Sequence, residues 1–479
     1  MITTINNKHN KLNFSSEREQ SQACLNSAEH EKNQGRKVLN VPNKREQNQT
    51  CLDSAEREGL RPKGNVPNLR FPEFQGEWEK CTFDKIAQYK KGPFGSALKK
   101  DIFVPQSEDT IKVYEQQNAI KKDWTLSRYY ITKDYFNSHM KQFVAKAGDL
   151  IVSCAGTIGE VYELPQDAEE GVFNQALMRV QVNDEAVNKE IFITVFSSMI
   201  DKFSKIYSNG SAIKNIPPFA DLKKTQVFLP CKEEQKKIAK LLALLDERIA
   251  TQNKIIEDLK KLKCAIIEKV FCSPNKKNPM CRIEGFEQAL STYKMCDFSS
   301  RITTKNKDSK CSLVLTIAAQ YGLVNQESFF NKSVASDNLT GYYLLHKGEF
   351  AYNRSYSAGY DWGAVKRLDN YDEGVLSTLY ICFKINETIV DSDYLTYYFE
   401  STKWHRGLSD IAGEGARNHG LLNVSITDYF NTKHRFPVIE EQKAIAKMLN
   451  TITEKERKAT LLGECYQKQK QYLLRQMFI

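Results

Sequence analysis

The sequence lacks the signatures of membrane, exported and metal-binding proteins. No stretch approaches the roughly 18 consecutive apolar residues that a membrane-spanning helix needs, and residues 1–13 contain no apolar core of a secretory signal. The 12 cysteines include no C-x-x-C pair, and the 7 histidines are isolated from one another. In a chain of 479 residues this pattern is typical of reduced thiols. We therefore expect a cytoplasmic protein with neither a disulfide framework nor a metal centre.

Catalytic signatures are also missing. There is no G-x-x-x-x-G-K-[ST] phosphate loop, no H-E-x-x-H and no G-x-S-x-G. Residues 215–219 approach the Asn-Pro-Pro-Phe pattern of adenine-N6 methyltransferases, but Ile216 interrupts it. No glycine-rich turn for the methyl donor accompanies them, and Gly413 and Gly415 follow no suitable strand. We expect no catalytic residue in this chain and no cofactor bound by it. A stand-alone adenine-N6 methyltransferase remains an alternative.

The composition indicates a globular protein with an acidic partner. Length alone suggests about three domains, and 41% hydrophobic residues suffice for buried cores. The net charge is +10 and the pI is about 8.8, which favours a nucleic acid as partner. A basic protein without a nucleic-acid role, such as a coiled-coil scaffold, stays open at this point.

One ten-residue segment occurs twice. Residues 233–242 (EEQKKIAKLL) return as residues 440–449 (EEQKAIAKML), identical at eight of ten positions with an offset of 207. Each copy follows a proline and opens a stretch with a helical pattern. The offset is far longer than the roughly 20–50 residues of a solenoid unit. The sequence therefore predicts a duplicated domain, each copy followed by a long helix.

This duplication divides the chain into five expected parts. Short apolar runs between glycine-rich turns and helical stretches predict an α/β or α+β fold for the two modules. The parts are a flexible polar tail at 1–65, a first module at 66–230, a spacer helix at 231–272, a second module at 273–437 and a second spacer helix at 438–479.

A heptad pattern marks the first spacer helix. Steps of four and three from Ile238 to Val270 meet eight apolar residues in ten, whereas the second helix is interrupted at Glu456, Gly463 and Lys470. A helix of this length measures about 58 Å. We expect the helices to pair antiparallel within the chain and to set the spacing of two modules in a pseudo-twofold repeat. An intermolecular coiled coil in a dimer is the alternative.

Basic and aromatic residues beside glycine-rich turns are the candidates for DNA contact. Residues 80–146 hold 13 Lys or Arg against 7 Asp or Glu, an excess that suits phosphate contacts. Asn and Arg can make bidentate contacts with adenine and guanine. For the lysines the alternative is a solvated turn, and for the tyrosines it is packing within a strand. The candidates are Lys90, Lys91, Phe94, Ser96, Lys99, Lys100, Thr157, Tyr352, Asn353, Arg354, Tyr356 and Arg417.

The repeated segment also supplies candidates for binding a partner protein. We expect Ile238, Leu242, Ile445 and Leu449 to build the helix seam. The polar residues beside them would then face a partner, and these are Gln235, Lys236, Gln442 and Lys443.

Together these features resemble the DNA-specificity subunit (HsdS) of type I restriction–modification enzymes. The resemblance rests on residues 91–99 (KGPFGSALK), 147–153 (AGDLIVS), 156–159 (GTIG), 352–354 (YNR) and the two repeated helix openings, and it covers about 66–479. It implies two target recognition domains, each recognising one half of a split site in double-stranded DNA. It also implies two methyltransferase (modification) subunits and restriction subunits as partners. S-adenosylmethionine, ATP and Mg²⁺ would then serve the complex rather than this chain. The tail with its own small repeat departs from the family pattern.

Overall fold

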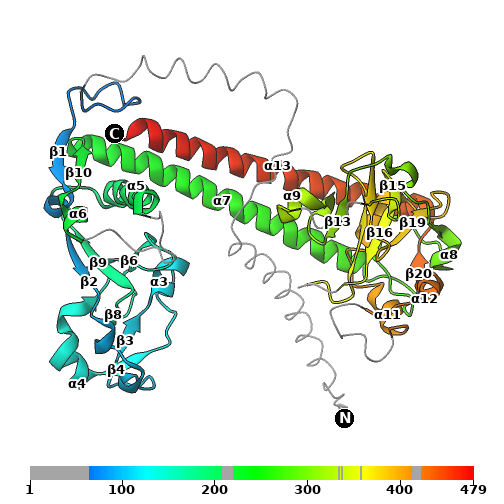
Figure 1. The fold of residues 1–479 in the computed structure, drawn as a ribbon, viewed down its shortest axis with the longest axis horizontal. Helices are drawn as coiled ribbons and strands as arrows, with labels where there is room; N and C mark the ends of the chain where they lie inside the picture. Colours follow the sequence, from blue (N-terminus) through cyan, green and yellow to red (C-terminus); the bar gives the residue numbers. More distant parts are fainter. Residues whose placement is uncertain (1–63, 208–218, 333–334, 336–337, 356–358, 413–421) are drawn as a thin grey trace, which may run out of the picture. The chain divides into compact units, whose positions relative to one another are not determined.

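The computed structural model describes residues 64–207, 219–332, 335, 338–355, 359–412 and 422–479 (Figure 1). Most of the expected tail, residues 215–218 of the methyltransferase-like segment, Tyr356 and Arg417 lie outside this set. The described chain forms two compact units. The first unit holds residues 64–251 with residues 462–479, and the second holds Gln252–Leu461. Each unit contains one module and part of both long helices.

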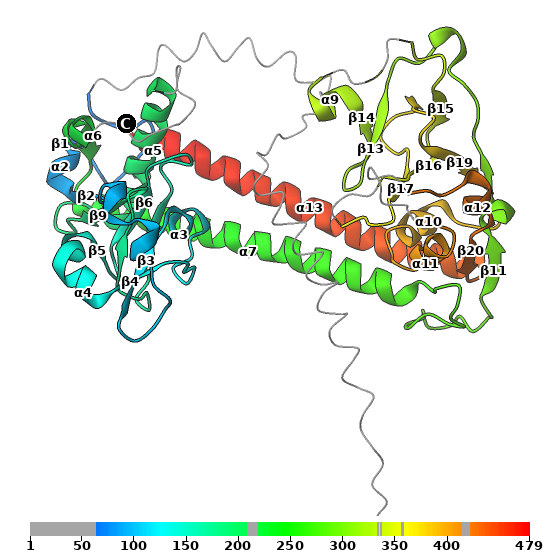
Figure 2. The ribbon, with the colours of Figure 1, turned by 60° about the horizontal axis from the view of Figure 1, so that its bottom comes forward.

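The first unit is built on two four-stranded sheets. One has the order β2-β9-β6-β7 and the other β4-β3-β8-β5, in which β3 and β8 are parallel. Figure 2 labels β2, β9 and β6 of the first sheet and β3, β4 and β5 of the second. Strand β1 forms a separate antiparallel pair with β10, and β10 directly precedes α7 in the chain. The strands are β1 Glu79–Thr82, β2 Ala87–Lys91, β3 Thr110–Tyr114, β4 Tyr130–Thr132, β5 Val144–Ala145, β6 Leu150–Ser153, β7 Val161–Glu163, β8 Gly171–Phe173, β9 Leu177–Val182 and β10 Gln226–Leu229. The short helices are α2 Phe83–Ile86, α3 Gln116–Lys121, α4 Lys133–Tyr135, α5 Lys189–Tyr207 and α6 Phe219–Lys224.

The second unit repeats this plan. Its four-stranded sheet has the order β12-β19-β16-β17, and β11 pairs with β20 just before α13. The pairs β13-β14 and β15-β18 are joined by a parallel bridge from Val314 to Val375, which corresponds to the parallel β3-β8 pair. The strands are β11 Ser291–Lys294, β12 Ser299–Arg301, β13 Leu315–Ala318, β14 Gly322–Asn325, β15 Tyr343–His346, β16 Phe350–Asn353, β17 Ala364–Arg367, β18 Glu373–Leu376, β19 Ile381–Ile385 and β20 Lys433–Phe436. The short helices are α8 Met295–Phe298, α9 Gln326–Phe330, α10 Ser392–Tyr398, α11 His405–Ser409 and α12 Ile426–Asn431.

The short sequence echoes between the modules are turn residues. Gly148 and Gly348 precede the central strands β6 and β16 with φ angles of 85° and 87°, a conformation that favours glycine. The next residue, Asp149 or Glu349, accepts a hydrogen bond from the backbone N–H three residues earlier. The same turn thus starts the same strand in both units. The expected fold class, two mixed α/β modules in a repeat with two long helices, is confirmed.

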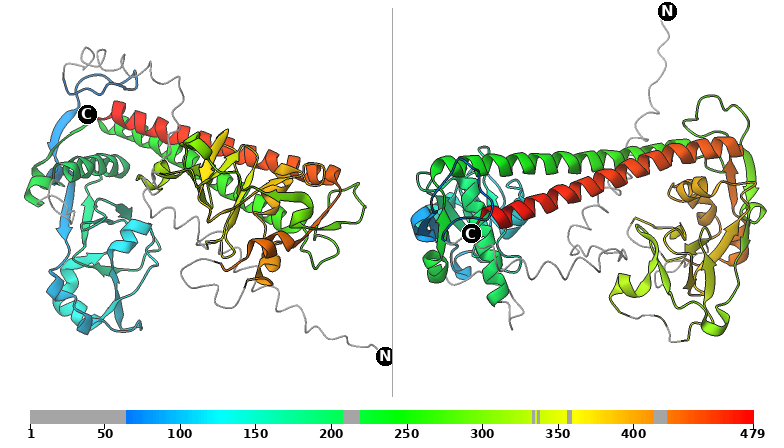
Figure 3. Two further views of the ribbon diagram at one scale, coloured as in Figure 1. Left: turned by 45° about the vertical axis from the view of Figure 1, so that its right-hand side comes forward. Right: turned by 90° about the horizontal axis from the view of Figure 1, so that it is seen from above.

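The two long helices are continuous and run antiparallel. α7 (Lys232–Val270) and α13 (Ile439–Met477) have 39 residues each, and both are divided between the units. In the second unit the ribbons of the two helices run side by side (Figure 3). There the amide of Gln252 donates to the Ala459 carbonyl over 2.9 Å, and Lys263 pairs with Glu456 at 2.7 Å.

In the first unit Asp246 pairs with Lys470. The guanidinium of Arg248 also lies 5.0 Å from the centre of the Tyr466 ring. The charged residues that interrupt the heptad pattern of α13 therefore have partners on α7. Within each unit the helices pair inside one chain, as expected, and not as an intermolecular dimer.

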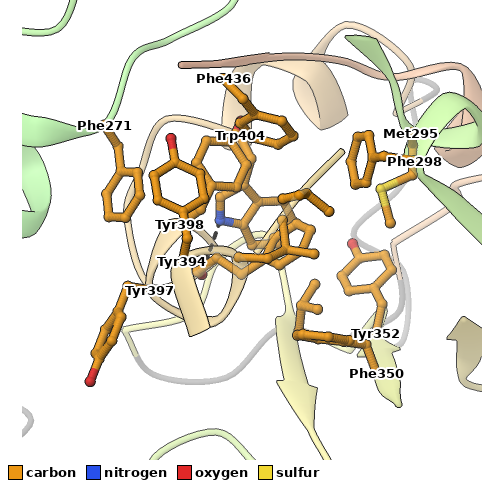
Figure 4. Close-up of a cluster of buried hydrophobic side chains, with 14 of the residues drawn as sticks. Phe271, Met295, Phe298, Phe350, Tyr352, Tyr394, Tyr397, Tyr398, Trp404 and Phe436 are labelled. Atoms are coloured by element: carbon orange, nitrogen blue, oxygen red, sulfur yellow. Dashed lines mark hydrogen bonds between the residues drawn. The ribbon is translucent and has the colours of Figure 1, made fainter. Parts of the chain in front are cut away.

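Each long helix ends in a hydrophobic core. Ile267, Val270 and Phe271, at the end of α7, join the core of the second unit, where the Phe271 ring lies 5.0 Å from Tyr394 (Figure 4). At the end of α13, Met477 joins the core of the first unit and Phe478 packs edge-on against Trp78. Apolar helix ends thus close both modules.

The repeated helix opening anchors each helix to its module. The amide of Gln235 donates to the Pro230 carbonyl at 2.9 Å, and its oxygen accepts from the Asn188 N–H at 2.7 Å. Gln442 does the same with the Pro437 carbonyl and the Asp391 N–H, both at 2.9 Å. Both glutamines are buried. The expectation that they face a partner protein is therefore wrong, because their amides satisfy backbone groups of the module.

The glutamate before each glutamine is buried and paired with an arginine from the segment that leads into the module. Arg70 donates from Nε and Nη2 to both carboxylate oxygens of Glu234 at 2.8 and 2.7 Å. Arg282 makes the same two-point contact with Glu441 at 2.9 and 2.7 Å. The sequence analysis missed these pairs. The repetition of Glu at the same place was a signal, but the arginines lie more than 150 residues away in the chain.

We predict that Arg282→Ala lowers the free energy of unfolding by about 3–5 kcal/mol, because it leaves the Glu441 carboxylate buried without its partner. Arg457→Ala is the matched control. Arg457 pairs with Glu454 on the exposed face of α13, and its loss should cost far less, because solvent screens an exposed ion pair. Urea unfolding followed by tryptophan fluorescence measures both. Equal losses for the two variants would contradict a structural role for the buried pair.

A buried histidine makes the second unit sensitive to acid. His434 is 3% exposed, and its ring nitrogens contact the Tyr398 hydroxyl at 3.0 Å and the Thr432 hydroxyl at 2.8 Å. Burial lowers the pKa of His434 to about 3. The folded state therefore keeps this ring neutral, whereas the unfolded chain binds a proton below about pH 6.5.

We predict a loss of stability between pH 6.5 and pH 3. Above this window neither state binds the proton and the stability is fully present. Within it, His434 should contribute a slope of up to about 1.4 kcal/mol per pH unit. His434→Gln should be less stable at pH 7 but should show a flatter pH profile in urea unfolding. His346→Gln, at an exposed position, should keep the wild-type slope.

Candidate DNA-recognition and partner-docking surfaces

Three loops of the first unit meet where strands β2 and β6 end and β9 begins, a place called the sheet edge. β2 ends at Lys91, which pairs with Met178 of β9, and β6 ends at Ser153, which pairs with Leu177. The segments 92–98, 154–160 and 174–176 therefore leave the sheet at the same edge. The Gly92 N–H donates to the Leu177 carbonyl at 2.9 Å, and a Cβ at Gly92 would overlap the Asn174 carbonyl oxygen. Only glycine allows the first loop to lie this close to the third.

Six of the DNA-binding candidates lie in residues 90–100, which comprise the end of β2, the first loop and the two residues after it, and are called the lysine loop. Lys91, Ser96, Lys99 and Lys100 are exposed, and Phe94 is 89% exposed. Within the described part of the chain, the three lysine amino groups have no hydrogen-bond or ion-pair partner. Lys90 differs, because its amino group donates to Gln142 at 2.8 Å and lies 5.1 Å from the centre of the Phe143 ring. A polyanion could therefore bind three of the four lysines without breaking an existing contact.

Thr157 lies in the second of these loops. Its side chain is exposed, and its carbonyl oxygen accepts a hydrogen bond from the Gln116 amide at 3.0 Å. Gln116 also donates to Ala155, so α3 holds this loop at two points. The structure thus brings Thr157 to the same sheet edge as the lysine loop.

In the second unit Tyr352 is a core residue. Its side chain is fully buried, its ring stacks on Tyr429 at 4.8 Å and its hydroxyl donates to the Trp362 carbonyl at 2.9 Å (Figure 4). Burial accordingly raises the pKa of its hydroxyl. The expectation of DNA contact by Tyr352 is wrong, because alternate residues of β16 face the core.

Asn353 and Arg354 follow at the end of β16, the place that Ser153 and Cys154 hold in the first unit. Both are partly exposed. The Asn353 side chain accepts a hydrogen bond from the Ser355 N–H at 3.0 Å. The Arg354 guanidinium donates to the carbonyls of Val424 at 3.1 Å and Leu379 at 3.2 Å. Arg354 therefore holds two loops together, and this use competes with contact to a guanine.

Two lysines remain as candidates for partner docking. Lys236 and Lys443 occupy equivalent positions at the starts of α7 and α13, and both are exposed. Lys443 borders an open hollow of about 560 Å³ on the surface of the second unit. The hollow is lined by Asp391, Asp393, Lys443, Ala446, Lys447, Asn450, Thr451, Glu454, Lys455 and Lys458. Charges of both signs on this face suit a polar protein surface better than a small apolar ligand.

The described residues offer no metal centre. No group of three or more His, Cys, Asp or Glu side chains among them could hold a metal ion. In the same part of the chain, no helix combines the length and apolar character needed to cross a membrane.

Comparisons with known proteins agree on one family. Residues 75–261 match the family model of the type I restriction modification DNA specificity domain. The chain is 23% identical over 407 residues to the specificity subunit of the type I restriction enzyme MjaVIII from Methanocaldococcus jannaschii, covering 80% of this chain and 87% of the relative.

One solved structure shares the fold, and a second shows a weaker likeness. One comes from work on complex assembly and conformational transition of the type I R-M system. It aligns with 83% of this chain and 96% of its own, at 13% identity and a TM-score of 0.51. The S subunit of a type I restriction–modification system from M. genitalium aligns with 86% of this chain and 99% of its own, at 16% identity and a TM-score of 0.47. Residues 75–261 therefore carry a type I restriction modification DNA specificity domain, and the sequence relative extends the similarity to a specificity subunit over 80% of the chain.

Proposed function

We propose that this specificity subunit recognises a bipartite site in double-stranded DNA, one half with each module. The observation that supports this most is one framework carrying two different surfaces. The same sheet edge bears the lysine loop in the first unit and Asn353 with Arg354 in the second. We assign the two target recognition domains to residues 66–230 and 273–437, and the spacers to 231–272 and 438–479.

In this proposal the chain itself is the non-catalytic, recognising member of a larger complex. Two methyltransferase subunits would dock at the equivalent junctions beside Lys236 and Lys443, and restriction subunits would join through them. S-adenosylmethionine, ATP and Mg²⁺ would act on those subunits. The complex would work in the cytoplasm, where its DNA substrate lies.

Methylome sequencing of cells with and without this gene product tests the proposal. The expected result is a methylated site made of two specified halves with an unspecified gap, present only when the chain is present. Exchange of residues 273–437 for the module of a relative should change one half only. A methylated site that does not depend on this chain would overturn the proposal.

We predict that Lys99→Ala with Lys100→Ala weakens DNA binding by the assembled modification complex for all sequences alike. Loss of two phosphate contacts should reduce the slope of log K against log salt by about 1.8, at roughly 0.9 per contact. Lys85→Ala is the matched control, because Lys85 is exposed but precedes β2 and so lies at the opposite end of that strand. An unchanged slope in the double variant would leave this loop as a solvated turn.

We predict that charge reversal at the two junctions changes the number of bound methyltransferase subunits. Lys236→Glu should lower occupancy from two copies to one, and addition of Lys443→Glu should abolish binding, because each junction would then repel its acidic contact. Native mass spectrometry counts the copies, and Lys260→Glu on the exposed side of α7 serves as control. A wild-type complex with a single methyltransferase subunit would contradict the symmetric junctions.

A further inference from the structure

Both units expose one large apolar side chain at the same edge of the corresponding sheet. In the first unit it is Phe94, 89% exposed, in the loop after β2. In the second unit it is Leu379, 62% exposed, in the loop before β19. The Phe94 loop packs on residues 174–176, which lead into β9, the counterpart of β19. Two different loops therefore bring an apolar group to equivalent places.

The first of these side chains is held in place by its backbone. Gly92 lies against the Asn174 carbonyl, where no other residue fits, and the next residue, Pro93, is buried. The Phe94 carbonyl then accepts a hydrogen bond from the Ala97 N–H at 2.9 Å. The ring is thus presented to solvent from a fixed turn, so little conformational entropy would be lost on binding.

The second side chain is held by polar contacts. The Leu379 carbonyl accepts from the Arg354 guanidinium at 3.2 Å, and its N–H donates to the Ser377 hydroxyl at 3.3 Å. Arg354 also contacts the Val424 carbonyl. Arg354 is therefore a positioning residue for Leu379, which explains why its guanidinium is directed at backbone groups.

The surroundings of Phe94 indicate DNA as the occupant. Lys91, Lys99 and Lys100 lie with Phe94 in residues 90–100 and are exposed. A protein partner would have to place a carboxylate against each of the three lysines around one apolar pocket, whereas any duplex offers phosphates to the lysines and base faces to the ring. Exposed Phe and Leu side chains are the kind that proteins insert between base steps. Stacking on a base is also tolerant of sequence. A neutral ring neutralises no phosphate, so it adds nothing to the counterion release that makes binding depend on salt.

We propose that Phe94 and Leu379 each insert against a base step, one in each half-site, and partly unstack it. This inference rests on the proposed function of the chain. Each module would then recognise not only base edges but also how easily its half-site deforms, since the cost of unstacking depends on the step. The lysines would bind the phosphates of the DNA backbone while the apolar side chain inserts between the stacked bases.

The test uses the complex of the full chain with its methyltransferase subunits. The DNA is a duplex that contains the site identified by methylome sequencing. Phe94→Ala should weaken binding by about 10- to 100-fold and leave the salt slope unchanged, in contrast to the lysine variants. Leu379→Ala should weaken it less, because a leucine offers a smaller surface. Met280→Ala, which removes another strongly exposed apolar side chain outside both sheet edges, is the control and should bind as wild type.

A fluorescent base analogue identifies the contacted step. With 2-aminopurine scanned through the site, fluorescence should rise on binding at one position in each half, and Phe94→Ala should remove the rise in one half only. Leu379→Ala should remove it in the other. Replacing the base at the affected position by an abasic site should make wild type and variant bind equally, as a double-mutant cycle requires.

Failure of this inference is separable from failure of the proposed function. A wild-type complex that binds no duplex specifically would refute the function itself. Specific binding with unchanged affinity in Phe94→Ala would refute the insertion of Phe94 and leave the proposed function standing. Loss of a methyltransferase copy from Phe94→Ala in native mass spectrometry would instead assign the ring to a protein contact and overturn the proposal.

Discussion

The buried carboxylate at the start of each long helix is the constraint on which each unit depends. Glu234 and Glu441 are at most 1% exposed. A charge removed from water costs several kcal/mol unless it is paired and hydrogen-bonded. The two-point contact with Arg70 or Arg282 offsets this cost, and the helix N-terminus favours the negative charge further. The pair ties the segment before the first strand to the helix, and the neighbouring glutamine ties the last loop to it.

This anchoring uses residues that the two modules share, and it leaves the loops at the strand ends free to differ between them. Some identical residues of the repeat, such as Gln235 and Gln442, are buried and bonded to their own module. Different residues stand at the ends of the sheet strands, where Phe94 follows β2 in one unit and Leu379 precedes β19 in the other. Loops that leave a fixed sheet can change without altering the anchor. Two modules of one architecture can therefore carry different loops at the ends of the same strands.

Sequence periodicity was enough for the duplication, the long helices and the mixed α/β modules, because these depend on local pattern. It could not assign the polar residues of the repeat, since whether Gln235 faces solvent depends on the loop near Asn188, 47 residues away. The prediction that Tyr352 contacts DNA was wrong for the same reason. The sequence pattern did not decide which face of the strand packs on the core, and the ring that stacks on Tyr352, Tyr429, comes from α12. Lys91, Lys99 and Lys100 are exposed, as a surface candidate must be, but exposure alone does not show a contact.

The charged residues that interrupt the heptad pattern of α13 fix the register of the two helices. Glu456 and Lys470 would destabilise a purely apolar seam, yet each is paired with an opposite charge on α7, Lys263 in one unit and Asp246 in the other. Buried or half-buried polar pairs fix the register of paired helices at some cost in stability. A slip by one heptad would separate both ion pairs and leave the Gln252 amide without the Ala459 carbonyl. Because both units carry such a pair, each unit contributes to the same helix register independently.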